Sequence, residues 1–315
     1  MRVIQGHAHV PAELRGAVVA VGNFDGVHRG HHAVIGEARR IAAEQGAPSA
    51  VVTFDPHPRR YFKPNDPPFE LTPLPAKARQ IAALGIDALF VLPFDPAMAA
   101  LTAHDFVAKP LVGGIQIRHV VVGFDFVFGN HRRGNVELLE GMAEEFGFGF
   151  TAVQPVQTAG AVCSSTTIRH LLRDGKPREA AAQLGRLWEI EGEVQTGDRR
   201  GRTIGFPTAN IALGPFVTPA IGVYAVWVGI GSRWHMGAAN IGSRPTVGGT
   251  DVRVEANVFD FSGDLYGQII RVALVDYLRP ELKFSGLDEL KARIAEDSKT
   301  ARAVLEAAPR LATVA

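Results

Sequence analysis

In the first half of the chain, short apolar runs alternate with helical patterns, and this alternation restricts the fold more than any other feature. The apolar runs cover 17–21, 50–54, 88–92, 119–122 and 149–153. The helical patterns between them cover 32–45, 77–84, 105–111 and 136–146. Strands buried on both faces read as continuous runs of Val, Ile and Leu, and their alternation with helices implies right-handed crossovers. The first half therefore predicts a doubly wound parallel sheet.

The hydrophobic period changes near residue 187. Trp188, Ile190 and Val194 alternate with glutamates, which is the two-residue period of a half-buried strand. Similar runs without intervening helices follow at 222–228, 234–241, 252–259 and 269–277. Such a series predicts an antiparallel sandwich or a small barrel.

The chain closes with an amphipathic helix at 287–307, in which Leu287, Leu290 and Ile294 share one face. We place the domain boundary near 185, which gives an α/β domain at 1–185 and an all-β domain with a C-terminal helix at 186–315. A chain of 315 residues is long enough for two separate cores.

Charge and cysteine content narrow the class of protein. The chain has 33 basic and 32 acidic residues and a net charge of +1, so no overall field marks a nucleic-acid or membrane binder. No apolar run resembles a signal peptide or reaches the length of a bilayer span. The single cysteine, Cys163, cannot form an internal disulfide and fits a reducing compartment. We expect a cytoplasmic protein.

A strand, a tight glycine-containing turn and a helix start follow one another within 17–31. Two histidines, His28 and His31, lie where that helix begins. The N–H groups of a first helical turn lack intrahelical partners and the helix dipole favours negative charge there, so the stretch predicts a phosphate site. Histidines at this place add protonatable donors. The alternative is a turn that carries two exposed histidines.

A second possible anion site opens a helix that runs to about residue 173. Ser164, Ser165 and Thr166 supply hydroxyl groups at the helix start, and Arg169 follows one turn later. Serine and threonine at this position also cap helices, and on this stretch alone capping is the favoured interpretation.

The second half contains the sequence GRTIGFPTAN at 201–210. Pro207 fixes the backbone just before Thr208 and Asn210, whose side chains lie on the same side of an extended chain. Paired neutral oxygens suit Mg²⁺ that shares nucleotide phosphates. The alternative, a strand start with hydroxyl-to-backbone bonds, is favoured on this stretch alone. Glu255 points away from the apolar face of 252–258, and a covering ligand would make it a candidate general base.

Several catalytic motifs are absent from the sequence. It contains no GxxxxGK[ST], GxGxxG, HExxH or GxSxG. P-loop kinases, Rossmann dehydrogenases, zincins and α/β-hydrolases are therefore disfavoured. His28-Arg29-Gly30-His31 instead resembles the HxGH signature of nucleotidyltransferases, in which a phosphate oxygen attacks the α-phosphorus of a nucleoside triphosphate.

Motifs throughout the chain extend this similarity. They are GNFDGVHRGH (22–31), VVTFDPHP (51–58), GFDFVFG (123–129), SSTTIR (164–169), GRTIGFPTAN (201–210), GVYAV (222–226), NIGSRPTVGG (240–249), DLYG (264–267) and LRPELKF (278–284). In this order they make the chain resemble bacterial bifunctional riboflavin kinase/FAD synthetases over nearly its whole length. The architecture predicted above is that of this family.

The resemblance implies an adenylylation site in the first domain. His28 and His31 would hold the ATP phosphates and stabilise the departing pyrophosphate. The loop that would lie against the nucleotide consists of Gly22, Asn23, Phe24, Asp25 and Gly26. Further residues of this site would be Asp125 in the flavin-nucleotide region and Ser164, Ser165, Thr166 and Arg169 at the helix start.

The resemblance implies a kinase site in the second domain. Thr208 and Asn210 would hold Mg²⁺ with ATP, beside Gly205 and Pro207 of the same motif. Glu255 would take the proton from the ribityl 5′-hydroxyl of riboflavin as that oxygen attacks the γ-phosphate. The C-terminal helix would help to cover the flavin. ATP, riboflavin and FMN would be the ligands, and we expect a monomer or a weak homo-oligomer.

The sequence departs from the family pattern at one position. Many relatives carry a basic residue where this chain has Val162, so a phosphate-directed charge is missing or is supplied by Arg132 or Arg133. Two alternatives stay open. One is an enzyme with a single activity whose α/β half is a regulatory or docking domain, and the other is a non-catalytic flavin-binding or storage protein.

Overall fold

The computed structural model describes residues 1–158, 160–196, 206–246 and 249–308, without the side chains of 244–246 and 249–251. The chain forms two compact units. The first contains 1–67 and 72–163, and the second contains 68–71 and 164–315. The boundary predicted near 185 concerns the limits of the functional domains and stays a prediction.

The first unit is built on a six-stranded sheet in which every neighbouring pair is parallel. The strand order is β1-β4-β3-β2-β5-β6. The strands are β1 (Arg2–Gln5), β2 (Val18–Val21), β3 (Ser49–Asp55), β4 (Ala88–Pro93), β5 (His119–Gly123) and β6 (Gly149–Val153). The five apolar runs of the first half all form strands of this sheet, which confirms the doubly wound fold.

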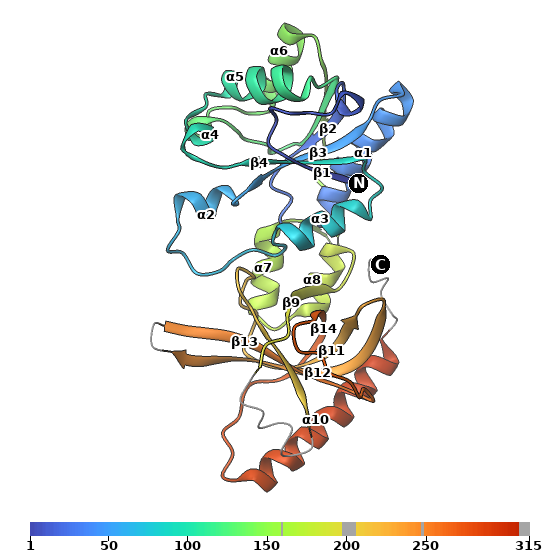
Figure 1. Cartoon of the computed structure of the whole chain (residues 1–315), viewed down its shortest axis with the longest axis vertical. Helices are drawn as coiled ribbons and strands as arrows, with labels where there is room; N and C mark the ends of the chain where they lie inside the picture. The colour runs from blue at the N-terminus through green and yellow to red at the C-terminus, as the bar shows by residue number, and fades with distance from the viewer. Residues whose placement is uncertain (159, 197–205, 247–248, 309–315) are drawn as a thin grey trace. The chain divides into compact units, whose positions relative to one another are not determined.

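Helices cover both faces of this sheet, as Figure 1 shows for α3 on one side and α5 and α6 on the other. Alternate residues of β2 enter different cores: Val18 packs in the cluster that contains Val34 of α1, and Val19 in the cluster that contains Leu139 of α6. The helices are α1 (Arg29–Gln45), α2 (Pro58–Phe62), α3 (Leu74–Ala82), α4 (Pro96–Ala100), α5 (Ala103–Phe106), a π-helical segment (Val107–Ile115) and α6 (Val136–Phe146).

Three helices of the first unit differ from the predicted ranges. The helix predicted at 77–84 spans Leu74–Ala82. The helix predicted at 32–45 begins at Arg29, because His28 caps it. The helix predicted at 105–111 begins at Ala103 and continues to Ile115. It continues because residues 107, 111 and 115, spaced by four, are all buried in the core. A small hairpin, β7 (Gln157–Thr158) and β8 (Ala161–Val162), follows the sheet and carries the exposed Val162.

The second unit is an antiparallel sheet in the order β10-β13-β12-β11-β14-β9. Its strands are β9 (Trp188–Glu193), β10 (Thr208–Ala212), β11 (Gly222–Ile230), β12 (Arg233–Thr246), β13 (Gly249–Val258) and β14 (Ile269–Arg279). The Gln195 N–H donates to the Asn210 carbonyl at 2.8 Å, so the two edge strands of the sheet meet. The predicted small barrel is confirmed.

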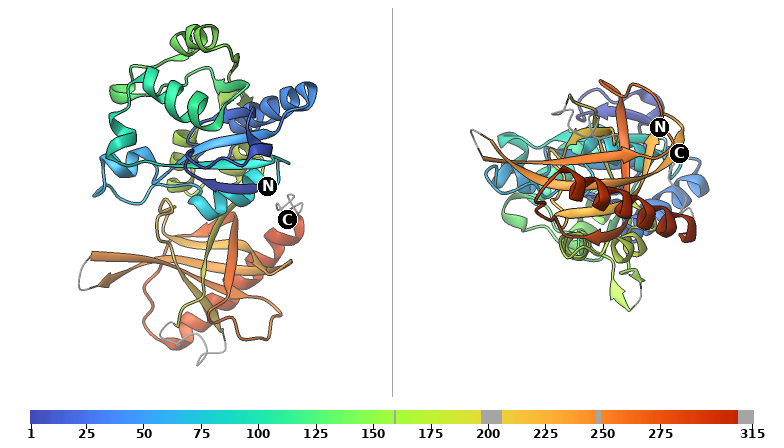
Figure 2. Two further views of the ribbon diagram at one scale, coloured as in Figure 1. Left: turned by 45° about the horizontal axis from the view of Figure 1, so that its top comes forward. Right: turned by 90° about the horizontal axis from the view of Figure 1, so that it is seen from below.

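Helices pack on the barrel in two places. Helices α7 (Ser165–Arg173) and α8 (Pro177–Leu184) contribute Ile168, Leu172 and Leu184 to the core that fills the barrel. Helix α10 (Leu287–Ala307) lies across the outer face over β11, β12 and β14 (Figure 2). Its buried apolar residues are Ala301 and Leu305.

The predicted apolar face of this last helix is only partly buried. Leu290 and Ile294 are half-buried, but Leu287 is 64% exposed. The second half of α10 instead makes the contact, and Asp297 there is bound to Arg279 of β14 through two guanidinium nitrogens. The polarity of this buried ion pair explains why an apolar pattern alone misplaced the packed face.

Candidate functional site

The turn after β2 places His28 and His31 in mutual contact at the start of α1. The His28 ring Nδ1 accepts the backbone N–H of His31 at 3.4 Å, and the His31 ring Nδ1 accepts the backbone N–H of His28 at 3.3 Å. The two rings stack with centroids 3.6 Å apart and an interplanar angle of 19°. The pair therefore forms a capping box in which imidazole nitrogens do the work that hydroxyl and carboxylate oxygens usually do.

This arrangement determines which ring nitrogen carries the proton. A neutral imidazole has one acceptor and one donor nitrogen, so acceptance at Nδ1 assigns the proton to Nε2 in both rings. The dipole of the 17-residue helix α1 adds a positive potential at the same place. Two ring N–H donors at a helix N-terminus are suited to phosphate oxygens.

Gly30 makes the close packing of His28 possible. A Cβ at position 30 would lie 3.1 Å from Nδ1 and Cε1 of the His28 ring. Such a contact is tighter than ordinary van der Waals packing, so a side chain here would push the imidazole away. The glycine of the HxGH motif therefore has a steric role in this chain.

The loop between β2 and α1 turns the side chains of Phe24 and Asp25 inward and leaves Asn23 exposed. Phe24 and Asp25 are both buried, and the Phe24 ring meets the His31 ring edge-on at 5.2 Å. A Cβ at Gly22 would lie 3.1 Å from the Phe24 ring, so Gly22 provides room for that side chain. A ligand on the solvent side of the loop would therefore contact the backbone rather than the Phe24 or Asp25 side chains.

Three loops meet at one edge of the parallel sheet. The 22–28 turn follows β2, the 55–57 segment follows β3, and the exposed Asp125 follows β5. The strand order reverses between β2 and β5, and ligands of open α/β sheets bind at such a switch point beyond the carboxyl ends. The structure therefore brings His28, His31 and Asp125 to the edge where a nucleotide site is expected.

Helix α7 belongs to the second unit and shows the helix cap that the sequence suggested. The Ser164 hydroxyl accepts the Thr167 N–H at 3.1 Å, so Ser164 is a cap, as the favoured interpretation of this stretch predicted. Ser165 and Thr166 lie in the first turn. Arg169 donates from Nε to the Phe69 carbonyl at 2.7 Å, with its guanidinium over the Phe69 ring. Anion binding by these residues stays a prediction.

A polar row crosses the outer face of the barrel. Asn210 of β10 lies opposite Glu255 of β13, and Glu255 lies opposite Asn240 of β12. Side chains that face each other on neighbouring strands have Cβ atoms about 5 Å apart. Thr208 lies on the same side as Asn210, two residues away, and receives the Asn210 side-chain N–H at its carbonyl and hydroxyl oxygens.

The neighbours of Glu255 confirm its predicted direction. Val254 and Ala256 are buried in the barrel core, whereas Glu255 is half-buried on the other face. Pro207 accepts the Asn257 side-chain N–H at its carbonyl, which ties the motif to β13. Gly205, predicted at the same site, lies outside the described residues.

Thr208 and Asn210 carry the oxygen types predicted for a magnesium site, and magnesium binding by them stays a prediction. Asn210 is almost fully buried. Its amide nitrogen donates to Thr208, so its side-chain carbonyl oxygen points away from Thr208. Hydroxyl and amide oxygens are ligands that suit Mg²⁺ when phosphates and waters complete the shell. Within the described ranges, no group of three or more His, Cys, Asp or Glu side chains is arranged to hold a metal.

Two residues near the first site were missed by the sequence analysis. Thr72 and Lys77 both bond to the 22–26 loop. Lys77 lies on the buried side of α3 beside Ala76 and Ile81. A lysine at a position where the helical period expects an apolar residue was the available signal.

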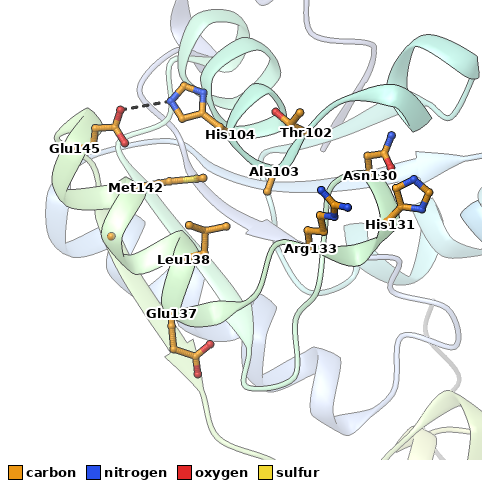
Figure 3. A pocket seen from close by; sticks show the side chains of 11 residues that line it. Thr102, Ala103, His104, Asn130, His131, Arg133, Glu137, Leu138, Met142 and Glu145 are labelled. Carbon is orange, nitrogen blue, oxygen red and sulfur yellow. Dashed lines mark hydrogen bonds and ion pairs between the residues drawn. The ribbon is translucent and has the colours of Figure 1, made fainter.

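A pocket of about 740 Å³ lies elsewhere in the first unit (Figure 3). Leu138 and Met142 of α6 line it, with His131 and Arg133 toward one side. His104 and Glu145 are joined there at 3.4 Å. Helix α6 packs on the face of the sheet opposite α1, and of the residues predicted for either site only Arg133, the possible substitute charge for Val162, lines the pocket. The candidate site is therefore the strand-end edge rather than this pocket.

Comparisons with known proteins cover both units. A family model described as FAD synthetase matches residues 10–167, and one described as riboflavin kinase matches residues 184–305. Relatives named bifunctional riboflavin kinase/FMN adenylyltransferase include those of Escherichia coli K12 (42% identical over 304 residues, 96% of this chain and 97% of the relative) and Bacillus subtilis 168 (37% over 310 residues, 96% of each).

A solved structure shares the fold. The structure titled "Crystal Structure of Macrolide-efflux Protein from Streptococcus pneumoniae" matches with a TM-score of 0.85 and 32% identity, covering 96% of this chain and 99% of that one. The described helices of the present chain include none that is both long and apolar enough to cross a bilayer.

Proposed function

The chain belongs to the family of bifunctional riboflavin kinases/FMN adenylyltransferases, and we propose from this premise how its residues divide the two reactions. It phosphorylates riboflavin with ATP to give FMN, and it adenylylates FMN with a second ATP to give FAD and pyrophosphate. One family match covers most of the first unit and the other lies within the second, which supports a separate site for each reaction.

The adenylylation step takes place at the β2–α1 turn. A phosphate oxygen of FMN attacks the α-phosphorus of ATP, and the bond to the pyrophosphate oxygen breaks. Negative charge grows on the departing pyrophosphate, and positioned donors stabilise it without a covalent intermediate. His28 and His31 supply these donors from Nε2. The observation that carries this assignment is the reciprocal capping, which commits both Nδ1 atoms to backbone N–H groups.

Other residues assigned to this step rest on family membership. The FAD synthetase match runs to residue 167 and so includes Ser164, Ser165 and Thr166. Their hydroxyl and N–H groups, with Arg169 beyond them, would bind nucleotide phosphates. Asp125, exposed after β5, would contact the flavin nucleotide.

The kinase step takes place on the polar row of the barrel. Thr208 and Asn210 would hold Mg²⁺, which when bound neutralises phosphate charge. Glu255 accepts the proton of the ribityl 5′-hydroxyl while that oxygen attacks the γ-phosphorus. The support for this role is the register that sets Glu255 directly opposite Asn210. Pro207 holds the strand start through its bond to Asn257.

The location and assembly of the enzyme belong to the same proposal. A chain whose single cysteine cannot form an internal disulfide, and whose substrates include ATP, fits the cytoplasm. A monomer or a weak homo-oligomer suits a chain that carries both reactions.

A product assay tests the two-reaction assignment. Purified enzyme is incubated with riboflavin and Mg-ATP, and flavins, ADP and pyrophosphate are separated by chromatography. FMN and ADP are expected first, followed by FAD and pyrophosphate. If FMN accumulates and added FMN is also not converted to FAD, the adenylylation assignment is wrong.

A further inference from the structure

Thr72 is bonded twice to the loop that precedes the two histidines. Its backbone N–H donates to Oδ1 of Asp25 at 3.0 Å, and its hydroxyl oxygen accepts the N–H of Gly26 at 2.8 Å. Thr72 is 3% exposed, so both bonds are shielded from water. The Gly26 N–H is thus directed toward Thr72.

Lys77 holds the same loop at Asn23, two residues before Asp25. Its ammonium Nζ donates to the Asn23 carbonyl at 2.7 Å, and the same carbonyl accepts the hydroxyl of Thr53 at 3.2 Å. Lys77 is 4% exposed. Burial of an ammonium is costly unless it is hydrogen-bonded, so this side chain has a defined position at the loop.

The loop that these residues hold is strained. Phe24 has φ of 46° and Val27 has φ of 40°, in the left-handed region that side chains rarely adopt. For a β-branched residue such as valine this conformation is an outlier and is energetically unfavourable. Such conformations persist only where surrounding contacts over-determine them. The bonds from Thr72 and Lys77 are contacts of this kind.

The strained turn leads directly into the histidine pair. Val27 immediately precedes His28, whose backbone N–H is one half of the capping box. A change of the Val27 backbone would therefore rotate the His28 N–H and shift both rings. The buried hydrogen bonds at Asn23, Asp25 and Gly26 thus determine the positions of the two imidazole rings and of their N–H donors.

We infer that Thr72 and Lys77 are positioning residues for adenylyl transfer, acting through the 23–27 turn on His28 and His31. The inference rests on the function proposed above for the two histidines. Neither residue touches the reacting atoms in this scheme. Each sets the orientation in which the ring donors meet the departing pyrophosphate, and a displacement of about 1 Å at such a site lowers rates by up to roughly 100-fold.

The experiment compares variants of the full-length enzyme. Thr72→Val keeps the size and the N–H of the residue but removes the acceptor for Gly26. We expect kcat for FAD formation from FMN to fall about tenfold or more, with a small change in KM for ATP, because the loss is in transition-state alignment. Thr72→Ser, which retains the hydroxyl, should restore the rate. Lys77→Met should lower kcat in the same way.

Internal controls separate positioning from folding. FMN formation from riboflavin is measured on the same preparations and should not change. Thr151→Val is the matched control, because the Thr151 hydroxyl bonds to His119 at 2.8 Å in the same unit, away from the turn. It should leave both activities near those of the wild type.

Three outcomes would overturn the inference. They are an unchanged rate of FAD formation in Thr72→Val, no rescue by Thr72→Ser, or equal losses of both activities. His31→Ala is measured in parallel. If that variant still forms FAD at the wild-type rate, the proposed function of the histidines fails. If it loses FAD formation while Thr72→Val does not, only the positioning role fails.

Discussion

His28 and His31 each accept the other's backbone N–H through ring Nδ1, at 3.4 and 3.3 Å, while their rings stack 3.6 Å apart. One pair of side chains thereby both begins helix α1 and presents two Nε2–H donors. The structural and chemical roles of the motif are carried by different nitrogens of the same rings. Substitutions can therefore separate the two roles.

His31→Ala should abolish FAD formation and leave FMN formation intact. The loss of one transition-state donor typically lowers a rate by on the order of 100-fold or more. The two activities are measured separately, with FMN or riboflavin as the starting flavin. Equal loss of both activities in a folded protein would contradict the two-site assignment.

His28→Asn tests the capping role independently. Asparagine is among the best N-cap residues, so the helix and the melting temperature should be retained. The variant lacks the Nε2–H donor, and FAD formation should fall by on the order of 100-fold. Near-normal adenylylation by a stable His28→Asn enzyme would show that His28 serves only as a cap.

Gly30→Ala should separate stability from activity. A Cβ at this position would lie 3.1 Å from the His28 ring, so the imidazole must move and FAD formation should fall several-fold. Helix propensity favours alanine over glycine by up to about 1 kcal/mol, so the free energy of unfolding should not fall together with the activity. Gly36→Ala, in the same helix with no atom within 4 Å of the added Cβ, is the control and should keep full activity.

The outcome for Gly30→Ala is measured by thermal unfolding and by FAD formation on the same samples. If both glycine variants have wild-type adenylylation rates, then the close packing at Gly30 does not matter for catalysis.

The fold could be predicted because its signals are local. The runs at 17–21 and 119–122 became neighbouring strands of the sheet, and the alternation around Glu255 placed its side chain on the outer face of the barrel. Each of these signals depends on the period of a single element and on the burial of one face.

The supports of the site could not be predicted, because they connect distant parts of the chain. The Thr72 hydroxyl reaches Gly26 across 46 residues, and Lys77 reaches Asn23 across 54. No sequence period records such a bond. The reciprocal use of Nδ1 by His28 and His31 is local, but it depends on a turn with positive φ at Val27, which valine does not signal.

Asp87 should make the first unit sensitive to acid. The backbone N–H and the hydroxyl of Ser49 donate to the Asp87 carboxylate at 2.9 and 2.7 Å, and these bonds lower its pKa below the ordinary value. Because the pKa is lower in the folded chain than in the unfolded one, the carboxylate stabilises the fold at neutral pH. This contribution is lost as the pH falls below about 4 toward the folded value.

Asp87→Asn removes the titrating group, so the difference in stability between variant and wild type should shrink as the pH falls from 7 to 3. Urea unfolding at a series of pH values measures this difference. Asp95→Asn is a useful comparison, because that carboxylate caps α4 by accepting the Met98 N–H in an exposed setting. If the difference in stability between Asp87→Asn and the wild type does not vary with pH, then Asp87 is not the source of the acid sensitivity.

Glu255→Gln should remove the kinase activity alone. Glutamine keeps the size of the side chain and can still accept a hydrogen bond, but it cannot take the proton from the ribityl hydroxyl. General-base catalysis contributes typically 100- to 10,000-fold, so FMN formation should fall on that order while FAD formation from supplied FMN stays normal. Glu193→Gln, an exposed glutamate at the end of β9, is the matched control and should have no effect. Near-normal FMN formation by Glu255→Gln would remove Glu255 as the base, and the residues around Asn210 would then have to be reconsidered.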